Sequence, residues 1–501
     1  MMGIRLFVEK KVAFQSEAER LKKQINDDLG LQLNGFRRLC VYDIFGCSNK
    51  ELDLLKWRVF AEPATDKIRL NVPMIPSGIL AFGYLPGQFD QKADSAKQCI
   101  QLILGKTDVT VFTKEVYLFD PISDIDLERL KKYVVNPVES ELVDLSLPPF
   151  VPPINQEPPV LSITGFTSMN KAQLVEMRKA MALAMSEADL EWIRNYFCEV
   201  GRNPTETEIR VLDTYWSDHC RHTTFETELV DIRFESDALA SPIKRTFAQY
   251  RSLRTELGQT DRPVTLMDMA TIYAKWFRKK HPDHNIEVSE EVNAASVIFD
   301  AEGEDYLVMF KNETHNHPTE IEPFGGASTC LGGAIRDPLS GRSVVYQGLR
   351  VTGAANVLAK VRDTMSGKLP QRVITKKAAL GFSAYGNQIG ISTTYVRELF
   401  HPGYVAKRME VGAVVGAVKK SNVIRKSPNP GDWVILVGGD TGRDGIGGAT
   451  GSSKAHNDCS LALSASEVQK GNAPIERKLQ RLFSHPEVTR IIKKCDDFGA
   501  G

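Results

Sequence analysis

The sequence has no long hydrophobic run and no surplus of charge. No apolar stretch in its 501 residues approaches the ~20 residues that span a bilayer. The opening residues, MMGIRLFVEKK, lack the apolar core and the small-residue cleavage site of a signal peptide. Lys plus Arg and Asp plus Glu both total 63, so no net field attracts nucleic acid or anionic membrane. We therefore expect neither partner, and we expect any bound nucleotide to be a small molecule in a site.

Cysteine pairs and a Walker A loop are also missing. The eight cysteines are scattered without a CxxC pair, which is typical of reduced thiols in a cytoplasm. The glycine-rich segment Gly438–Ser453 (GGDTGRDGIGGATGSS) lacks the GK[ST] ending of a Walker A loop. It could still contact a phosphate through its backbone, and tight packing is an equally good interpretation. We expect a cytoplasmic protein with free thiols.

The pattern of elements predicts several domains. With 42% hydrophobic and 25% charged residues, the composition is that of a globular protein. Up to Asn136-Pro137, strands and helices alternate as in a small α+β unit with helices on one face of an antiparallel sheet. The proline-rich stretch Leu147–Pro159 (LPPFVPPINQEPP) predicts a boundary. Two helices should follow, capped by Ser186 and by Asn203.

From Val230 onward the pattern is mixed α/β. Short apolar runs predict strands, one of them at Trp433–Val437. The glycine-rich segment Gly381–Gly390 (GFSAYGNQIG) predicts a turn-rich loop.

The stretch richest in functional groups is Tyr306–Asp337 (YLVMFKNETHNHPTEIEPFGGASTCLGGAIRD). If the chain stays extended after Phe310, one face carries Lys311, Glu313, His315 and His317. The glycine pairs that follow predict a loop with free backbone amides between Gly325 and Gly333. A cation, a carboxylate, imidazoles and free amides suit a magnesium-nucleotide site. The other interpretation is a polar strand end followed by a flexible loop.

A second cluster, SDHCRHTTF, follows a predicted helix end and contains His219, Cys220 and His222. Catalysis or substrate contact, a structural surface role and zinc ligation are the three interpretations. The spacing is poor for zinc, because adjacent residues do not easily reach one tetrahedral ion and no second Cys/His pair sits at finger spacing. Catalysis or substrate contact is therefore favoured.

The segment FKNETHNHPTEIEPFGGASTCLGGAIRD (310–337) closely resembles the nucleotide and substrate loops of phosphoribosylformylglycinamidine synthase, the ATP-dependent amidation enzyme of purine synthesis. Further motifs match in the family's order: YLPGQFDQKADSAKQC, NPVES, GRNPTETE, SDHCRHTTF, GNQIG, GRDGIGGATGSS and DDFGAG. The order is similar to that of the large single-chain form. The resemblance implies a mixed α+β fold with a small ferredoxin-like N-terminal domain (1–146) and a Pro-rich connector with a helical linker (147–229). An aminoimidazole ribonucleotide synthetase-like module would follow, with halves at 230–400 and 401–501.

The resemblance also implies roles for individual residues. His219 and His315 match the two active-site histidines of the family. The implied magnesium ligands are Glu313, Asp337 and Asp497, and the implied substrate contacts are Thr314, His315, Asn316, His317, Arg336 and Gln469. The implied ATP-binding positions are Lys311, Gly326, Ala327, Ser328, Thr329, Cys330, Leu331, Gly332, Gly333, Ala334, Ile335, Arg336 and Asp337.

The implied reaction is amidation of formylglycinamide ribonucleotide with ATP, Mg²⁺ and ammonia derived from glutamine. Because the DxGAGG loop of the family is cut at Gly501, the resemblance implies a fragment whose second synthetase-like repeat and glutaminase domain are missing partners. His222 stands where the small form has a nucleotide-contacting tyrosine, so no role is predicted for it. Another synthetase of the same superfamily and a non-catalytic nucleotide-binding or docking fragment are the alternatives.

Overall fold

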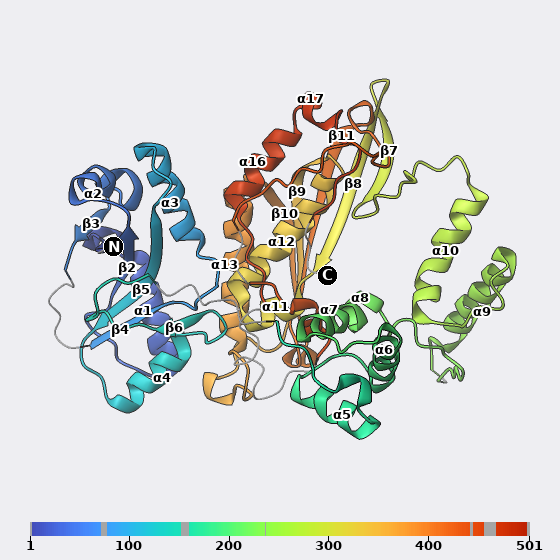
Figure 1. Cartoon of the computed structure of the whole chain (residues 1–501), viewed down its shortest axis with the longest axis horizontal. Coiled ribbons are helices and arrows are strands. Elements are labelled where there is room, and N and C mark those ends of the chain that lie inside the picture. The colour runs from blue at the N-terminus through green and yellow to red at the C-terminus, as the bar shows by residue number, and fades with distance from the viewer. Residues whose placement is uncertain are drawn as a thin grey trace.

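The computed structural model describes residues 3–71, 78–151, 160–235, 237–440, 444–454 and 467–497. Figure 1 shows an N-terminal unit on the left and a central sheet with its helices in the middle. Helices α9 (Ala240–Leu257) and α10 (Leu266–Lys280) lie on the right, apart from the central sheet. Most of the predicted proline-rich connector and residues 441–443 of the predicted glycine-rich segment lie outside the described residues. Within the described ranges, no helix is long and apolar enough to cross a membrane, and the seven cysteines are free thiols.

The N-terminal unit contains a six-stranded antiparallel sheet in the order β3-β1-β2-β5-β4-β6. Its strands are β1 (Ile4–Lys10), β2 (Arg37–Phe45), β3 (Asp66–Arg69), β4 (Gly78–Tyr84), β5 (Thr110–Phe119) and β6 (Ser140–Leu142). Its helices are α1 (Ser16–Leu29), α2 (Asn49–Leu55), α3 (Gln91–Leu104) and α4 (Asp124–Val134). In a ferredoxin-like sheet, another strand lies between the two strands of each βαβ unit. Here β1 pairs directly with β2, and β4 pairs directly with β5. The α+β class is confirmed, with this strand order in place of the ferredoxin-like one.

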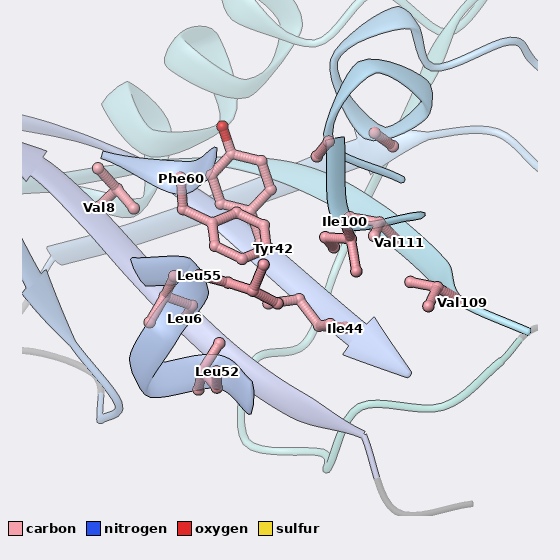
Figure 2. Close-up of a cluster of buried hydrophobic side chains, with 12 residues drawn as sticks. Leu6, Val8, Tyr42, Ile44, Leu52, Leu55, Phe60, Ile100, Val109 and Val111 are labelled. Carbon is pink, nitrogen blue, oxygen red and sulfur yellow. The ribbon is translucent and has the colours of Figure 1, made fainter. Parts of the chain in front are cut away.

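The helices of this unit cover one face of the sheet, as the sequence predicted. By register and alternation, Leu6, Tyr42 and Tyr117 share that face. Figure 2 shows the buried cluster in which Leu6 and Tyr42 pack with Ile100 of α3. Farther along the same face, Tyr117 packs in a cluster with Leu130 of α4 and with residues of α1.

The linker region consists of α5 (Lys171–Ala180), α6 (Glu187–Val200), α7 (Glu206–Trp216) and the single turn α8 (Asp218–Arg221). Ser186 caps α6, as predicted. Helix α7 is capped by Thr205 rather than by the predicted Asn203. The Thr205 hydroxyl accepts from the Glu208 N–H while the Glu208 carboxylate accepts from the Thr205 N–H. This reciprocal pair satisfies two N-terminal donors at once, which moves the helix start beyond Asn203.

The central sheet has the order β10-β9-β11-β8-β7, with β9 and β10 parallel and the other neighbours antiparallel. Its strands are β7 (Ala295–Ala301), β8 (Glu304–Thr314), β9 (Val344–Ala354), β10 (Ser392–Phe400) and β11 (Met409–Lys419). Helices α12 (Pro323–Ser340) and α13 (Gln371–Ile389) pack against one face, and α16 (Ala473–Phe483) packs against both helices. This mixed sheet completes the predicted fold class.

Both predicted glycine loops are helical. The segment from Gly325 to Gly333 lies inside α12, and Gly381 lies inside α13, which ends at Ile389 with Gly390 in the left-handed conformation. Close helix packing explains the glycine at 381, because a Cβ there would lie 2.0 Å from the Phe324 carbonyl oxygen. The Gly325 N–H, in the first turn, donates to the Glu322 carboxylate at 2.9 Å, and amides farther into the helix donate to carbonyls four residues earlier. The free backbone amides that the sequence predicted are therefore not present in this segment.

The predicted strand Trp433–Val437 is not a strand in the structure. Its side chains are highly exposed, with Val434 at 99%. A strand needs a neighbour to pair its N–H and C=O groups, and none of the strands among the described residues pairs with this segment.

Candidate functional site

A cavity of about 380 Å³ brings together residues that are far apart in the chain. Of the residues predicted from the sequence, those that line it are His219, Lys311, Glu313, Thr314, His315, Asn316, His317, Thr329, Gly333, Arg336, Asp337, Gln469 and Asp497. They come from α8, β8, α11 (Asn316–Ile321), α12 and the segment 467–497. The other positions of the predicted ATP-binding set lie on α12 away from the lining: Gly326, Ala327, Ser328, Cys330, Leu331, Gly332, Ala334 and Ile335.

The end of β8 supplies one charged wall of the cavity. Lys311 Nζ lies 2.5 Å from an Asp337 oxygen and 3.4 Å from Glu313 Oε2. Burial alone would lower the pKa of Lys311, but the hydrogen bond and charge of Asp337 outweigh it and raise that pKa. Burial raises the pKa of Asp337 to about 6; Lys311 opposes this shift, and the charges of Asp497 and Glu313 add to it. Three carboxylates and a lysine therefore crowd one wall.

The predicted extended pattern stops at Thr314, because α11 begins at Asn316. His315 Nδ1 lies 2.6 Å from the Gly326 carbonyl oxygen. A carbonyl only accepts, so Nδ1 carries the hydrogen and donates it. Burial lowers the pKa of His315 to about 4, so the ring is neutral at pH 7. The other ring nitrogen, Nε2, therefore carries no hydrogen and can accept a hydrogen bond. His315 lines the cavity.

Two charged lining residues escaped the sequence analysis, Lys407 and Glu467. Glu467 Oε2 lies 2.8 Å from Nε2 of His317, which is buried. The one signal for Glu467 is its position two residues before Gln469, which would put both on one side of an extended chain. Lys407 belongs to no motif and enters the site only through the fold.

The linker helices bring His219 to the cavity. Its backbone N–H donates to Ser453 Oγ at 2.9 Å, and the Thr214 and Thr450 hydroxyls lie 3.3 Å apart. These contacts dock α7 and α8 on α14 (Gly448–Ser452). Cys220 and the two residues after it do not line the cavity. Among the residues the structure describes, no group of three or more His, Cys, Asp or Glu side chains is arranged to hold a metal ion.

The N-terminal unit supports the segment that carries Gln469. Asn136, from the motif NPVES, donates its side-chain amide to the Ile321 carbonyl oxygen at 2.9 Å. The backbone amides of Phe89 and Lys470 donate to the two oxygens of one carboxylate, Asp444, at 3.2 and 2.9 Å. No chemical role was predicted for these motifs, and in the structure they hold loops beside the cavity.

The buried carboxyl group of Glu476 lies close to Arg336. Arg336 Nε donates to Asp497 Oδ2 at 3.0 Å. Behind it the Tyr385 hydroxyl donates to Glu476, and both side chains are buried. Burial raises the pKa of Glu476 to about 7, although the charge of Arg336 and the Tyr385 hydrogen bond oppose the shift.

The raised pKa of Glu476 predicts a pH-dependent stability. The folded chain holds this proton up to about pH 7, whereas an unfolded glutamate releases it near pH 4.3. The contribution of Glu476 to the free energy of unfolding is therefore full below about pH 4 and falls as pH rises toward 7. Between pH 5 and pH 8, we expect Glu476→Gln to gain about 3 kcal/mol relative to wild type. Urea unfolding of both proteins at each pH measures this.

The control for this experiment is Glu128→Gln, which removes an exposed carboxylate of α4. Its stability relative to wild type should show no comparable pH trend. A difference between wild type and Glu476→Gln that stays constant from pH 5 to pH 8 would contradict the prediction.

The sequence is similar to a known protein family and to named proteins of that family. Residues 174–222 match the family model of the formylglycinamide ribonucleotide amidotransferase linker domain. Through this match and the motifs around the cavity, the chain is similar to the formylglycinamide ribonucleotide amidotransferases. More particularly, it is similar to the PurL subunits of phosphoribosylformylglycinamidine synthase, which confirms the predicted resemblance.

The matches to individual relatives are partial. The chain is 29% identical over 338 residues to PurL of Thermoplasma volcanium, covering 66% of this chain and 37% of the relative. It is 30% identical over 322 residues to PurL of Methanopyrus kandleri, covering 64% and 36%. Among solved structures, Thermotoga maritima PurL complexed with FGAR matches at 22% identity with a TM-score of 0.38, covering 61% and 38%. The chain thus spans somewhat over a third of the length of these relatives, and the large single-chain form stays a prediction.

Proposed function

We propose that the chain forms a substrate and ATP site of a phosphoribosylformylglycinamidine synthase, the enzyme of the fourth step of de novo purine biosynthesis. The observation that carries the proposal is the convergence on one cavity of His219, the 311–337 stretch, Gln469 and Asp497. The names of the curated relatives point to the same reaction. The substrates would be ATP, formylglycinamide ribonucleotide and ammonia.

In this reaction the amide oxygen of the ribonucleotide takes the γ-phosphoryl group of ATP, and ammonia then displaces phosphate from the iminophosphate to give the amidine. Lys311 and Arg336 offer positive charge to the transferring group. Glu313, Asp337 and Asp497 are hard oxygen donors on a common wall, and burial first, then the charges of Asp497 and Glu313, raise the pKa of Asp337. The three do not by themselves form a metal cluster, but Mg²⁺ is usually held by one or two carboxylates together with substrate phosphates, so members of this set with the phosphates of ATP would hold the ion. When bound, the ion would spread the charge of the phosphate oxygens.

The two histidines would handle protons. His315, held by the Gly326 carbonyl through Nδ1, presents Nε2 as the acceptor for a proton from the amide or the attacking ammonia. His219 would assist from α8. The substrate contacts would come from Thr314, Asn316, His317 and Gln469. Ammonia would be released from glutamine by a glutaminase partner.

The test is ATP hydrolysis driven by ammonium chloride in the presence of formylglycinamide ribonucleotide. We expect phosphate release to require both the ribonucleotide and ammonium, in the chain alone or joined to the remainder of a PurL-type synthase. Phosphate release that needs formylglycinamidine ribonucleotide instead would favour another synthetase of the superfamily. Binding of ATP without turnover in either form would favour the non-catalytic fragment.

A further inference from the structure

The cations that line the cavity are Lys311, Arg336 and Lys407. Lys407 differs from the other two because it has no carboxylate partner among the described residues. Lys311 is paired with Asp337, and Arg336 is paired with Asp497. Within the described parts of the chain, no carboxylate oxygen lies within 4.0 Å of Lys407 Nζ. Its hydrogen bond goes to the Lys454 carbonyl oxygen at 3.4 Å. This ammonium is therefore available to an anion that enters the cavity.

The backbone holds Lys407 at the cavity wall. The next residue, Arg408, donates its N–H to Glu320 at 2.8 Å, and its buried guanidinium is paired with Glu398 and Glu410. Burial lowers the pKa of Lys407, and the charges of Glu320 and Glu467 offset this only in part. A half-buried cation that has one long hydrogen bond to a carbonyl oxygen and no paired anion recovers only part of the hydration it has lost. A bound anion would restore that loss.

Lys407 and Lys311 serve different parts of the cavity. The carboxylates that act on Lys407 are Glu320 and Glu467, whereas those that act on Lys311 are Asp337 and Glu313. The Lys311 part carries the three carboxylates that the proposed function assigns to Mg²⁺ together with the phosphates of ATP, and therefore suits ATP. The Lys407 part has no such cluster among its neighbours, so it suits a phosphate that arrives without a metal ion.

We infer that Lys407 binds the monophosphate group of the ribonucleotide substrate. The inference rests on the proposed function. A lysine ammonium forms charge-assisted hydrogen bonds to phosphate oxygens. Asn316, which also lines the cavity, accepts the Glu410 N–H through its side-chain oxygen and keeps its NH₂ as a further donor. Lys407 would thus fix the end of the substrate opposite to its reacting amide.

Calorimetric titration of the 501-residue chain tests this with three probes: formylglycinamide ribonucleotide, its dephosphorylated ribonucleoside, and ATP with Mg²⁺. In Lys407→Gln, we expect the ribonucleotide to bind roughly 10- to 100-fold more weakly, as for a lost hydrogen bond between charged groups. The affinities for the ribonucleoside and for ATP should stay unchanged. Lys407→Arg should recover part of the loss. The control is Lys426→Gln, an exposed lysine outside the cavity, which should bind like wild type.

Unfolding midpoints of each variant show whether the fold is kept, and Lys407→Arg covers the case in which the glutamine variant is unstable. Equal ribonucleotide affinity in wild type and Lys407→Gln would overturn the inference and leave the proposed function standing. A loss confined to ATP would also overturn it, because Lys407 would then serve the other phosphate source. A wild-type chain that binds neither ribonucleotide nor ATP would contradict the proposed function itself.

Discussion

Replacing His315 by alanine should lower ammonia-dependent amidation by about 10²- to 10⁴-fold, the usual contribution of general acid–base help. The loss should appear in kcat, since the imidazole acts on the reacting proton and not on the phosphate ends of the substrates. His315 donates from Nδ1 to the Gly326 carbonyl oxygen, so the ring is fixed with Nε2 as the acceptor. Steady-state amidine formation in the intact synthase, with ammonium chloride as donor, measures the effect.

Two further variants separate chemistry from folding in this experiment. His315→Asn keeps an N–H donor for the Gly326 carbonyl but has no basic nitrogen, so it should be folded and equally slow. His485→Asn changes an exposed histidine outside the cavity and should turn over like wild type. Wild-type turnover in His315→Ala would remove His315 from the chemistry.

The residues of the cavity were predictable where they lie in contiguous motifs. Glu313, Thr314 and His315 are adjacent in the chain, so the fold needs only to turn one segment toward the cavity. The alternation of the predicted strand put Lys311 and Glu313 on one face together with His315 and His317, and it holds as far as Thr314, where β8 ends. His219 required more, because its place depends on α7 and α8 docking on α14.

The errors trace to tertiary contacts that leave no local signal. Glycine was interpreted as loop backbone, but at Gly381 it permits α13 to approach the Phe324 carbonyl. A glycine needed for close packing and a glycine needed for a turn look the same in one sequence. Lys407 and Glu467 were missed for a related reason: each contributes to the cavity only through neighbours brought together by folding.

Glu410 should be one of the most sensitive positions for stability. Its fully buried carboxylate accepts from Arg350 Nε at 2.6 Å and from Arg408 Nε at 2.9 Å. Glu410→Gln leaves Arg408 with Glu398, and it removes the carboxylate that is paired with the buried guanidinium of Arg350. Removing one member of a buried ion pair costs about 3–5 kcal/mol, because the remaining charge has neither water nor partner. We expect a loss of that size in the free energy of unfolding, measured with urea at pH 7.

Glu410→Gln should also disturb the candidate site, because the Glu410 backbone holds the residues at the start of α11. The His315 N–H donates to the Glu410 carbonyl oxygen at 2.9 Å, and the Glu410 N–H donates to Asn316. The matched control is Glu304→Gln, which breaks an exposed pair with Lys419 and should leave stability unchanged within error. If Glu410→Gln is as stable as this control, the buried charges do not hold β9 and β11 together. If it is unstable but binds ribonucleotide normally at low temperature, the network supports the sheet and not the position of His315.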